Sequence, residues 1–465
     1  MAIIAPFRAL RYDSSTVAAE NVLTQPYDKI SPAMQDRYYA ASPYNLVRII
    51  LAKPDPSDSD PLAVYNRAAT SLRDWRSQGI LCQDPEPGIY AYQQRFVIPG
   101  DLSGATHVRD GFIALLRLED YSNNVVHRHE QTLSKPKADR LNLLRATRAH
   151  CGQIFMLYEG HSDPIGELPS EPTTALHDEY GVEHRLWRIT DPHRVASIVE
   201  FMADKRLVIA DGHHRYETAL AFRNEQRQKN LGNPRVPHPE HSEGWEQERH
   251  EYVMATFINM ASPGLAILPT NRVVHGLPNF ETGWFVNFAR NNFMFQDVSS
   301  LMPRLNGTGP HFDPVVAQRL LRCELPGTTT LSRERLPGPG DVVMLAVTRN
   351  STFLFYSKPG WADTVLAAFS PLERQLDVVQ LHKLILETVL ELSDQDIRDQ
   401  KNVRYIRDSS EAVAEVERGA DIAFLMNPVR MSQVRDIAFS GGVMPQKSTD
   451  FYPKLLSGLT IYSLD

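Results

Sequence analysis

The chain has 465 residues, of which 42% are hydrophobic and 23% are charged, a composition typical of globular proteins. At about 150 residues per domain, this length predicts two or three domains that each bury a core. The formal net charge is −7, which argues against the basic field that recruits nucleic acid, so we expect no nucleic-acid partner.

Cysteine spacing and hydropathy indicate the compartment. The three cysteines, Cys82, Cys151 and Cys323, are far apart and none belongs to a CxxC pair. This pattern is typical of a reducing compartment and predicts no structural zinc. No stretch approaches the roughly 18 apolar residues of a membrane span, and the apolar start is too short for a signal peptide. We therefore expect a cytoplasmic protein with no membrane partner.

The first 275 residues show a mixed pattern of strands and helices. Apolar runs and alternating runs predict strands at 45–51, 88–97, 108–117, 152–158, 205–210 and 252–260. Helical periodicity predicts helices at 61–78, 137–148, 192–204 and 213–226. Residues 226–250 are polar and contain prolines, which predicts a loop or insertion.

The texture changes after about residue 275, where Gly/Pro-rich segments begin. Two strands are predicted at 341–348 and 352–357, a long amphipathic helix at 371–392, and a β/α pair near 403–435. The sequence therefore predicts an α/β (α+β) protein with two domains, residues 1–275 and 276–465, the second also α/β.

The segment IADGHHRYETA, residues 209–219, is the strongest candidate site. An Asp-Gly turn joins a short apolar strand to a helix, and places His213, His214 and Arg215 in its first turn. Cations there are normally unfavourable, because the N-terminal end of a helix is electropositive and its first N–H groups lack partners. An anion, most simply phosphate, explains them. Asp211 can cap the helix, and Gly212 allows a ligand to approach the backbone; the alternative is a solvated polar turn.

A second basic cluster lies in residues 128–148, RHEQTLSKPKADRLNLLRATR. Ser134 is a predicted N-cap, and Lys135, Lys137 and Arg140 follow it at the start of a helix. The alternative is a solvated basic helix face. Glu130 lies just upstream, and a carboxylate beside a basic cluster is what phosphoryl transfer needs, because it accepts the proton of the nucleophile. We expect residues 130–140 and 211–217 to open into one cleft.

Further polar residues offer alternatives. His127 and His129 alternate and could share a metal ion with a third ligand, but the spacing matches no known ligand motif. We prefer Mg²⁺ held by nucleotide oxygens, with Asp211 as a possible ligand, over a resident metal site. Lys447, Ser448 and Thr449, with Lys454 nearby, form a hydroxyl-rich basic segment that could close over phosphates or could simply dock. Asp28 and Lys29 lie in a Pro-containing turn, read as plain turn chemistry.

No Walker A, GxGxxG, GxSxG or HExxH pattern occurs. The chain instead resembles, nearly end to end, the bacterial and archaeal domain-of-unknown-function 1015 family. The segments that show this are PYDKIS, SPYNLVRI, RHEQTLSKPKADRLNLLRAT, IADGHHRYETAL, NMASPGLAILPTNRVV and KSTDFYPKLLSGL. That family name implies no activity.

A shorter resemblance, to a second group of proteins, implies an activity. DGHHR followed by an aromatic residue and an acid is similar to the signature of the ParB/sulfiredoxin superfamily, whose free-serine kinases contain DGHHR itself. The resemblance implies a ParB/sulfiredoxin-like core with insertions. It also implies that residues 211–215 bind phosphates and substrate. His213 stands where sulfiredoxins have a reactive cysteine, which argues against peroxiredoxin repair.

The sequence thus predicts an ATP- or ADP-dependent kinase, with Mg²⁺, that phosphorylates a small hydroxyl metabolite. The first candidate is free L-serine, giving O-phosphoserine. Glu130 or Asp211 is the expected base, and the expected phosphate ligands are Gly212, His213, His214, Arg215, Lys135, Lys137 and Arg140. His129, Lys447, Ser448 and Thr449 are the expected substrate residues. The alternatives are a nucleotide-binding regulatory switch and a phosphohydrolase.

Overall fold

The computed structural model describes residues 1–56, 58, 60–101, 103–130, 135–231, 246–291, 293–301, 312–324, 342–358, 364 and 366–465. The chain forms two compact units. Unit 1 comprises Met1–Arg128, Thr132–Ala266 and Phe451–Asp465, and unit 2 comprises His129–Gln131 and Ile267–Asp450. The last segment of the chain therefore belongs to the same unit as the first.

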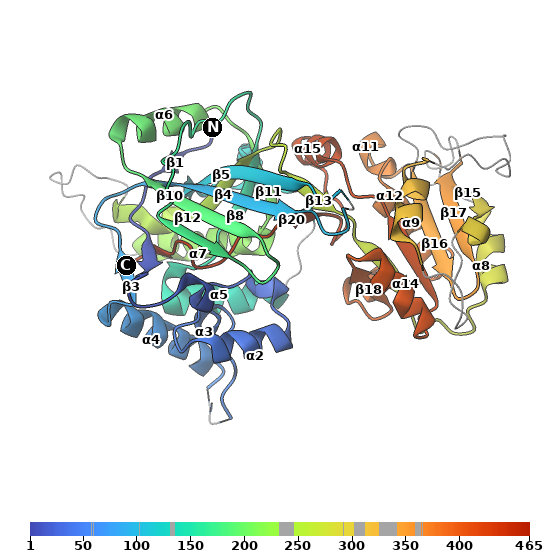
Figure 1. The fold of residues 1–465 in the computed structure, drawn as a ribbon, viewed down its shortest axis with the longest axis horizontal. Helices are drawn as coiled ribbons and strands as arrows, with labels where there is room; N and C mark the ends of the chain where they lie inside the picture. The colour runs from blue at the N-terminus through green and yellow to red at the C-terminus, as the bar shows by residue number, and fades with distance from the viewer. Residues whose placement is uncertain are drawn as a thin grey trace. The chain divides into compact units, whose positions relative to one another are not determined.

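Unit 1 is built on a large mixed sheet, shown in Figure 1. Its strands, in spatial order, are β6 (Val126–His127), β11 (Leu207–Asp211), β8 (Ile154–Tyr158), β12 (Tyr252–Asn259), β5 (Thr106–Arg117), β4 (Ile89–Val97), β10 (Glu183–Ile189) and β9 (Thr174–His177). β1 (Ile4–Ala5) also pairs with β5. Two pairs are parallel, β6 with β11 and β8 with β12, and the other neighbours are antiparallel. The central strands β8, β11 and β12 are almost wholly buried, as expected for strands covered on both faces.

Helices cover this sheet. The longer ones are α2 (Pro32–Ala41), α4 (Ala63–Ser77), α5 (Lys135–Thr147), α6 (Pro192–Met202) and α7 (His213–Leu231). α5 packs against both α4 and α7. The buried side chains of α6 and α7 join those of the strands in one hydrophobic core, so the start of α7 is fixed on a rigid base. Shorter elements are β2 (Leu10–Tyr12), α1 (Ala19–Val22), η1 (Tyr27–Lys29), α3 (Val47–Ile50), β3 (Leu81–Gln83), η2 (Tyr121–Asn123), β7 (Ala149–His150), η3 (Glu246–Glu251) and β21 (Tyr462–Ser463).

Unit 2 contains an antiparallel sheet. Its spatial order is β15 (Phe293–Asp297), β17 (Thr352–Ser357), β16 (Val343–Thr348), β19 (Ile422–Met426), β14 (Asn271–Val274) and β18 (Val403–Ile406). The helical elements are α8 (Thr282–Ala289), η4 (Ser299–Leu301), α9 (Pro314–Leu321), α11 (Pro371–Arg374), α12 (Asp377–Gln380), the π-helix η5 (Leu381–Glu387), α13 (Asp394–Arg398), α14 (Ser409–Glu417) and α15 (Met431–Phe439). The chain passes between the units within β13 (Ala266–Leu268) and β20 (Asp450–Tyr452).

The structure confirms the mixed α/β class and corrects two predicted elements. Residues 45–51 are not a strand: the side chain of Asn45 accepts a hydrogen bond from the Val47 amide (2.9 Å), and the short helix α3 follows. Such short apolar runs do not distinguish a strand from a buried helix. The long helix at 371–392 is three short pieces, α11, α12 and η5.

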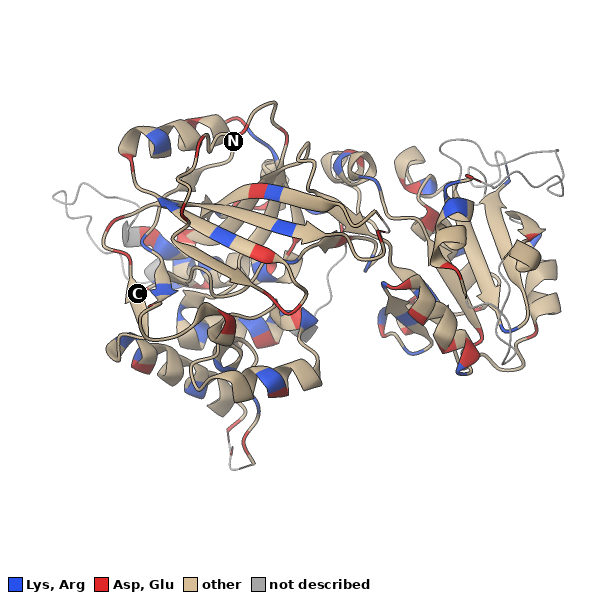
Figure 2. Ribbon diagram, viewed as in Figure 1, with Lys and Arg blue, Asp and Glu red and all other residues tan. Residues whose placement is uncertain are grey.

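Charged residues are interspersed on both units, as Figure 2 shows. Within the part of the chain that the structure describes, no helix is long and apolar enough to cross a membrane. Most of the predicted insertion at 226–250 lies outside the described residues.

Candidate functional site

The strand β11 and the helix α7 meet at Asp211 and Gly212. The register of β11 against β8 shifts between Ile209 and Asp211, which leaves Ala210 as an extra residue. Such a bulge changes the direction of the next side chain, and bulges are common beside functional sites. Gly212 has φ = +94°, a backbone conformation that favours glycine, and α7 starts at the next residue. The turn and helix start inferred from DGHHR are therefore present in the structure.

Cations surround the carboxylate of Asp211. Arg215 donates to it over 3.1 Å, and also donates to the carbonyl of Gln153. Burial by itself raises the pKa of Asp211, but the charges of Lys454, Arg215, Lys29 and His213 lower it well below its ordinary value. Several positive groups thus act on one carboxylate, so the start of α7 is electropositive.

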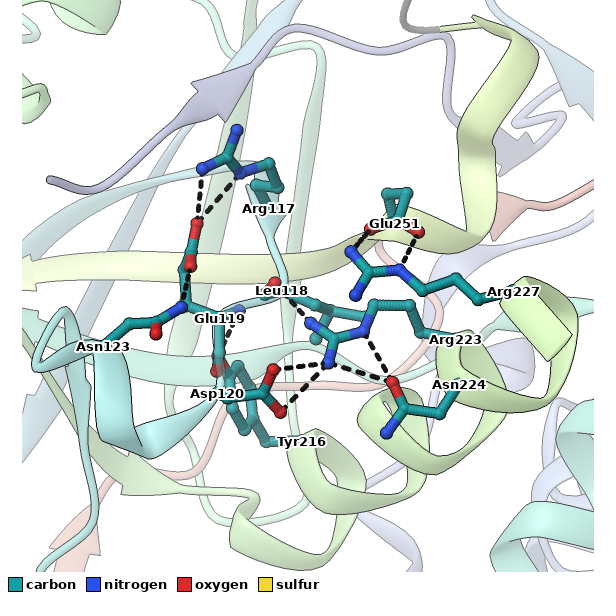
Figure 3. Close-up of polar contacts among 10 residues, drawn as sticks. All are labelled: Arg117, Leu118, Glu119, Asp120, Asn123, Tyr216, Arg223, Asn224, Arg227 and Glu251. Carbon is teal, nitrogen blue, oxygen red and sulfur yellow. Dashed lines mark hydrogen bonds and ion pairs between the residues drawn. The ribbon is translucent and has the colours of Figure 1, made fainter. Parts of the chain in front are cut away.

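The helix α7 is anchored to the end of β5 (Figure 3). Arg223, which is 2% exposed, donates to the carbonyl of Leu118 over 2.7 Å and to the Asp120 carboxylate over 2.9 and 3.0 Å. The Tyr216 hydroxyl accepts from the Glu119 amide over 3.0 Å and donates to the Glu119 carbonyl over 2.7 Å. These contacts fix the rotation of α7 about its axis and its position along that axis, and hence the position of its first turn.

A buried arginine holds the segment that contains Lys454. Arg109, on β5, is 1% exposed; it donates to the Tyr452 carbonyl over 2.9 Å, to Gln94 Oε1 over 3.0 Å and to the carbonyl of Pro453. Gln94 Nε2 donates to the Lys454 carbonyl over 2.9 Å. Burial lowers the pKa of Arg109 to about 9. Two core side chains therefore bind three successive carbonyls and set the backbone from which Lys454 reaches Asp211.

A cavity of about 80 Å³ lies beside Arg215, between α5 and α7. Arg140 and Arg215 are among its lining residues. Arg140 donates to Asp139 and to the carbonyl of Ile50, and it stacks 4.2 Å from the ring centre of Tyr27. The cavity and the Asp211 cluster thus share the side chain of Arg215.

His150 also lines this cavity and makes unit 1 sensitive to acid. Its ring stacks on Tyr462 at 6.0 Å between ring centres, and burial lowers the pKa of His150 to about 4. The unfolded chain takes up this proton near pH 6.5. The stability that neutral His150 contributes is therefore complete above pH 6.5 and is lost as the pH falls toward 4, by up to about 3 kcal/mol.

We accordingly expect His150→Gln to flatten part of the decline in the thermal midpoint between pH 6.5 and 4. The exposed His177 is the matched control, and His177→Gln should leave the decline unchanged. Identical pH profiles for His150→Gln and the unmodified chain would contradict the assignment.

The other predicted cations of unit 1 are engaged with acidic residues. Lys137 forms an ion pair with Glu217, on the second turn of α7, and Arg128 lies 4.0 Å from the same carboxylate. The predicted cap Ser134 and the side chain of Lys135 lie outside the described residues.

Glu130 belongs to unit 2, where three of the predicted substrate residues surround it. The carboxylate accepts a hydrogen bond from the Lys447 amide over 2.7 Å and another from the Thr449 hydroxyl over 3.4 Å. His129 Nε2 lies 2.8 Å from that hydroxyl. Ser448 instead turns inward, is 4% exposed and donates to the carbonyl of Pro445. The structure thus brings together residues more than 300 positions apart that the sequence had proposed separately.

Arg272, on β14, lies close enough to interact with Glu130. It is 2% exposed, and burial lowers its pKa, while Tyr405, Asp377 and Glu130 oppose that shift. It donates to the Lys447 carbonyl over 3.3 Å. Arg272 therefore supports the segment that holds Glu130, and the sequence analysis had missed it.

Metal ligands do not gather in the part of the chain that the structure describes: no three His, Cys, Asp or Glu side chains lie together as a metal site needs. His127 Nε2 is 3.2 Å from the carbonyl of Asn124. An ion at Asp211 would therefore depend on ligand oxygens.

The sequence analysis interpreted Lys29 as turn chemistry and named Lys454 only as part of a segment that could close over phosphates or simply dock. Each is one lysine in an ordinary surface-like context, so only their approach to Asp211 distinguishes them.

The chain is a mixed α/β protein with a cation-rich strand-to-helix turn. It belongs to the DUF1015 family of proteins of unknown function, whose model matches residues 4–379. This confirms the resemblance inferred from the motifs. No curated protein matches the chain.

Solved structures give only faint likenesses. A free serine kinase variant in complex with ADP is 11% identical over 75% of this chain and 92% of its own, with a TM-score of 0.34. A conserved hypothetical protein from Pyrococcus furiosus is 12% identical over 76% and 95%, also at 0.34. SbnI with a C-terminal truncation, from Staphylococcus aureus, is 11% identical over 75% and 87%, at 0.32. TM-scores this low carry no information on activity, and the relation to the ParB/sulfiredoxin superfamily stays a prediction.

Proposed function

We propose that this protein is an ATP- or ADP-dependent kinase that phosphorylates the hydroxyl group of a small metabolite, with free L-serine as the first candidate. The observation that supports this most directly is the cluster of Lys29, Arg215 and Lys454 around Asp211 at the start of α7. The backbone of Gly212, the first N–H groups of α7 and these cations would bind the phosphates.

The two candidate acids differ in suitability as a base. The lowered pKa of Asp211 makes that carboxylate a poor proton acceptor, and suits it to orienting cations. Glu130 accepts hydrogen bonds from one amide and one hydroxyl, and we assign the base to Glu130. The acceptor oxygen would attack the terminal phosphorus, the base would take up its proton, and the shortened nucleotide would leave. Mg²⁺ would enter with the nucleotide and offset phosphate charge.

The phosphate site is tested by Arg215→Ala in the full-length protein. Loss of a charge-assisted hydrogen bond should weaken ATP and ADP binding about 10- to 100-fold in calorimetric titration with Mg²⁺. The control is Arg145→Ala, which removes an exposed arginine of α5 paired with Glu225 and should leave affinity unchanged. Equal affinity in Arg215→Ala and the unmodified protein would remove the proposed site.

Turnover is tested by following phosphorus NMR signals with nucleotide, Mg²⁺ and L-serine. The proposal expects O-phosphoserine that appears only when both substrates are present. Free phosphate without an acceptor would identify a phosphohydrolase instead. Tight nucleotide binding with no turnover on any hydroxyl acceptor would favour the regulatory switch.

A further inference from the structure

The cavity between α5 and α7 is lined by both apolar and polar residues. The apolar ones include Ile50, Leu143, Leu144, Ala149 and Val253, and the polar ones include Arg140, Arg215, Thr218 and Ser457. No Asp or Glu is among the described residues that line it. An apolar cavity with a few converging polar groups is the usual form of a small-molecule site.

Two threonines that line the cavity, one on α5 and one on α7, differ in their hydrogen bonds. Thr147, on α5, donates to the carbonyl of Leu143 one turn earlier over 2.8 Å, which is how a buried helical threonine is normally satisfied. Thr218, on α7, is 5% exposed, and its buried hydroxyl has no hydrogen-bond partner among the residues that the structure describes. A buried hydroxyl without a partner is unfavourable, so a ligand group that reaches Thr218 from the cavity would relieve this cost.

The absence of a side chain at Gly152 leaves space beside the polar residues Arg215 and Ser457. A Cβ atom added at Gly152 would lie 3.4 Å from Arg215 Nη1 and 3.5 Å from Ser457 Oγ. Arg215 donates to Gln153 and Asp211, but a guanidinium has five N–H groups, so donors remain for a third partner. Positive charge, hydroxyl groups and free volume thus occur together.

We propose that this cavity binds a compact organic anion: a small carboxylate with a hydroxyl group, held by Arg215 and by the hydroxyl of Thr218. The volume of about 80 Å³ is smaller than the roughly 150 Å³ cavity that accepts benzene, which limits the ligand to a few heavy atoms. The inference rests on the proposed function for its ligand class, because free L-serine is a small carboxylate with a hydroxyl group, but binding itself requires neither nucleotide nor turnover. Since Arg215 also contacts Asp211, a bound ligand would act on the cation cluster there.

The test compares thermal midpoints of the full-length protein with L-lactate, D-glycerate and the uncharged L-lactamide, without nucleotide. The proposal expects both carboxylates to raise the midpoint and L-lactamide to have no effect at the same concentrations. If neither carboxylate shifts it at any concentration, the cavity contains water only and the proposal is wrong.

Two variants locate the binding. Thr218→Val removes the unsatisfied hydroxyl with little change of shape, so it should raise the midpoint of the ligand-free protein and weaken carboxylate binding about tenfold. Thr147→Val is the matched control on the facing wall; it should lower that midpoint slightly and leave affinity within about twofold, as one hydrogen bond is lost away from the ligand. Gly152→Ala should weaken binding while the fold is kept, because the added methyl group makes only ordinary contacts.

Carboxylate binding that is the same in Thr218→Val, Gly152→Ala and the unmodified protein would place the ligand elsewhere and overturn the proposal. Nucleotide titration is read separately. A protein that binds carboxylates but no nucleotide would contradict the proposed kinase and support this inference. A protein that binds nucleotide but neither carboxylate would contradict this inference and leave the proposed kinase unaffected.

Discussion

Replacing Glu130 with Gln should leave nucleotide affinity unchanged and lower the rate of phosphoryl transfer about 10²- to 10⁴-fold. The amide retains an oxygen that can accept the hydrogen bond from Lys447, so the local structure should persist. It cannot take up the proton of the acceptor hydroxyl, which is what a general base contributes. Single-turnover rates and calorimetric titration, measured on the same preparation, separate the two quantities.

Asp211→Asn is the matched comparison for that experiment. Because Asp211 is assigned to organising cations, its amide should alter nucleotide affinity more than the transfer rate of the bound complex. A variant pair in which Asp211→Asn abolishes transfer while Glu130→Gln retains it would reverse the roles of the two acids.

The largest effect on stability is expected from Arg109→Met. The substitution keeps an apolar stem but leaves Gln94 Oε1 and the carbonyls of Tyr452 and Pro453 without their donor inside the core. Unpaired buried acceptors cost about 1–3 kcal/mol each, partly offset because a charge no longer needs to be buried, so we expect unit 1 to lose about 2–4 kcal/mol. Hydrogen exchange of the β4 and β5 amides measures this for unit 1 alone.

Arg95→Met supplies the control, since Arg95 also lies in this sheet but its side chain is 45% exposed and its ion pair with Glu183 is 3.5 Å long. Exposed pairs contribute about 0–1 kcal/mol, so protection should change little. Arg109→Met should also weaken nucleotide binding, because Lys454 loses its fixed backbone. Exchange rates that match those of Arg95→Met would show that the buried hydrogen bonds of Arg109 are not needed.

Local patterns in the sequence predicted much of unit 1. The alternating residues 88–97 and the apolar residues 152–158 and 252–260 correspond to β4, β8 and β12. Alternating and continuous apolar runs of this length are both typical of strands and can be recognised from neighbouring residues alone. The helix beginning at Pro192 follows from its Asp191 cap and first-turn proline. Prediction failed at 45–51, where a short apolar run has no distinctive period, and at 371–392, where the predicted long helix is divided into α11, α12 and η5.

The sequence by itself determined the mixed α/β class, the family and the Asp-Gly turn before α7. Each depends on residues that are neighbours in the chain. Only the tertiary structure decided which polar groups interact. The charges of Lys29 and Lys454 act on Asp211, and the Lys447 amide and the Thr449 hydroxyl donate hydrogen bonds to Glu130. The two residues of each of these pairs are 182 to 319 positions apart in the sequence. The pattern of neighbouring residues cannot predict such contacts. Those of Asp211 exist because the sheet of unit 1 brings distant segments together and because Arg109 and Gln94 bind the backbone beside Lys454.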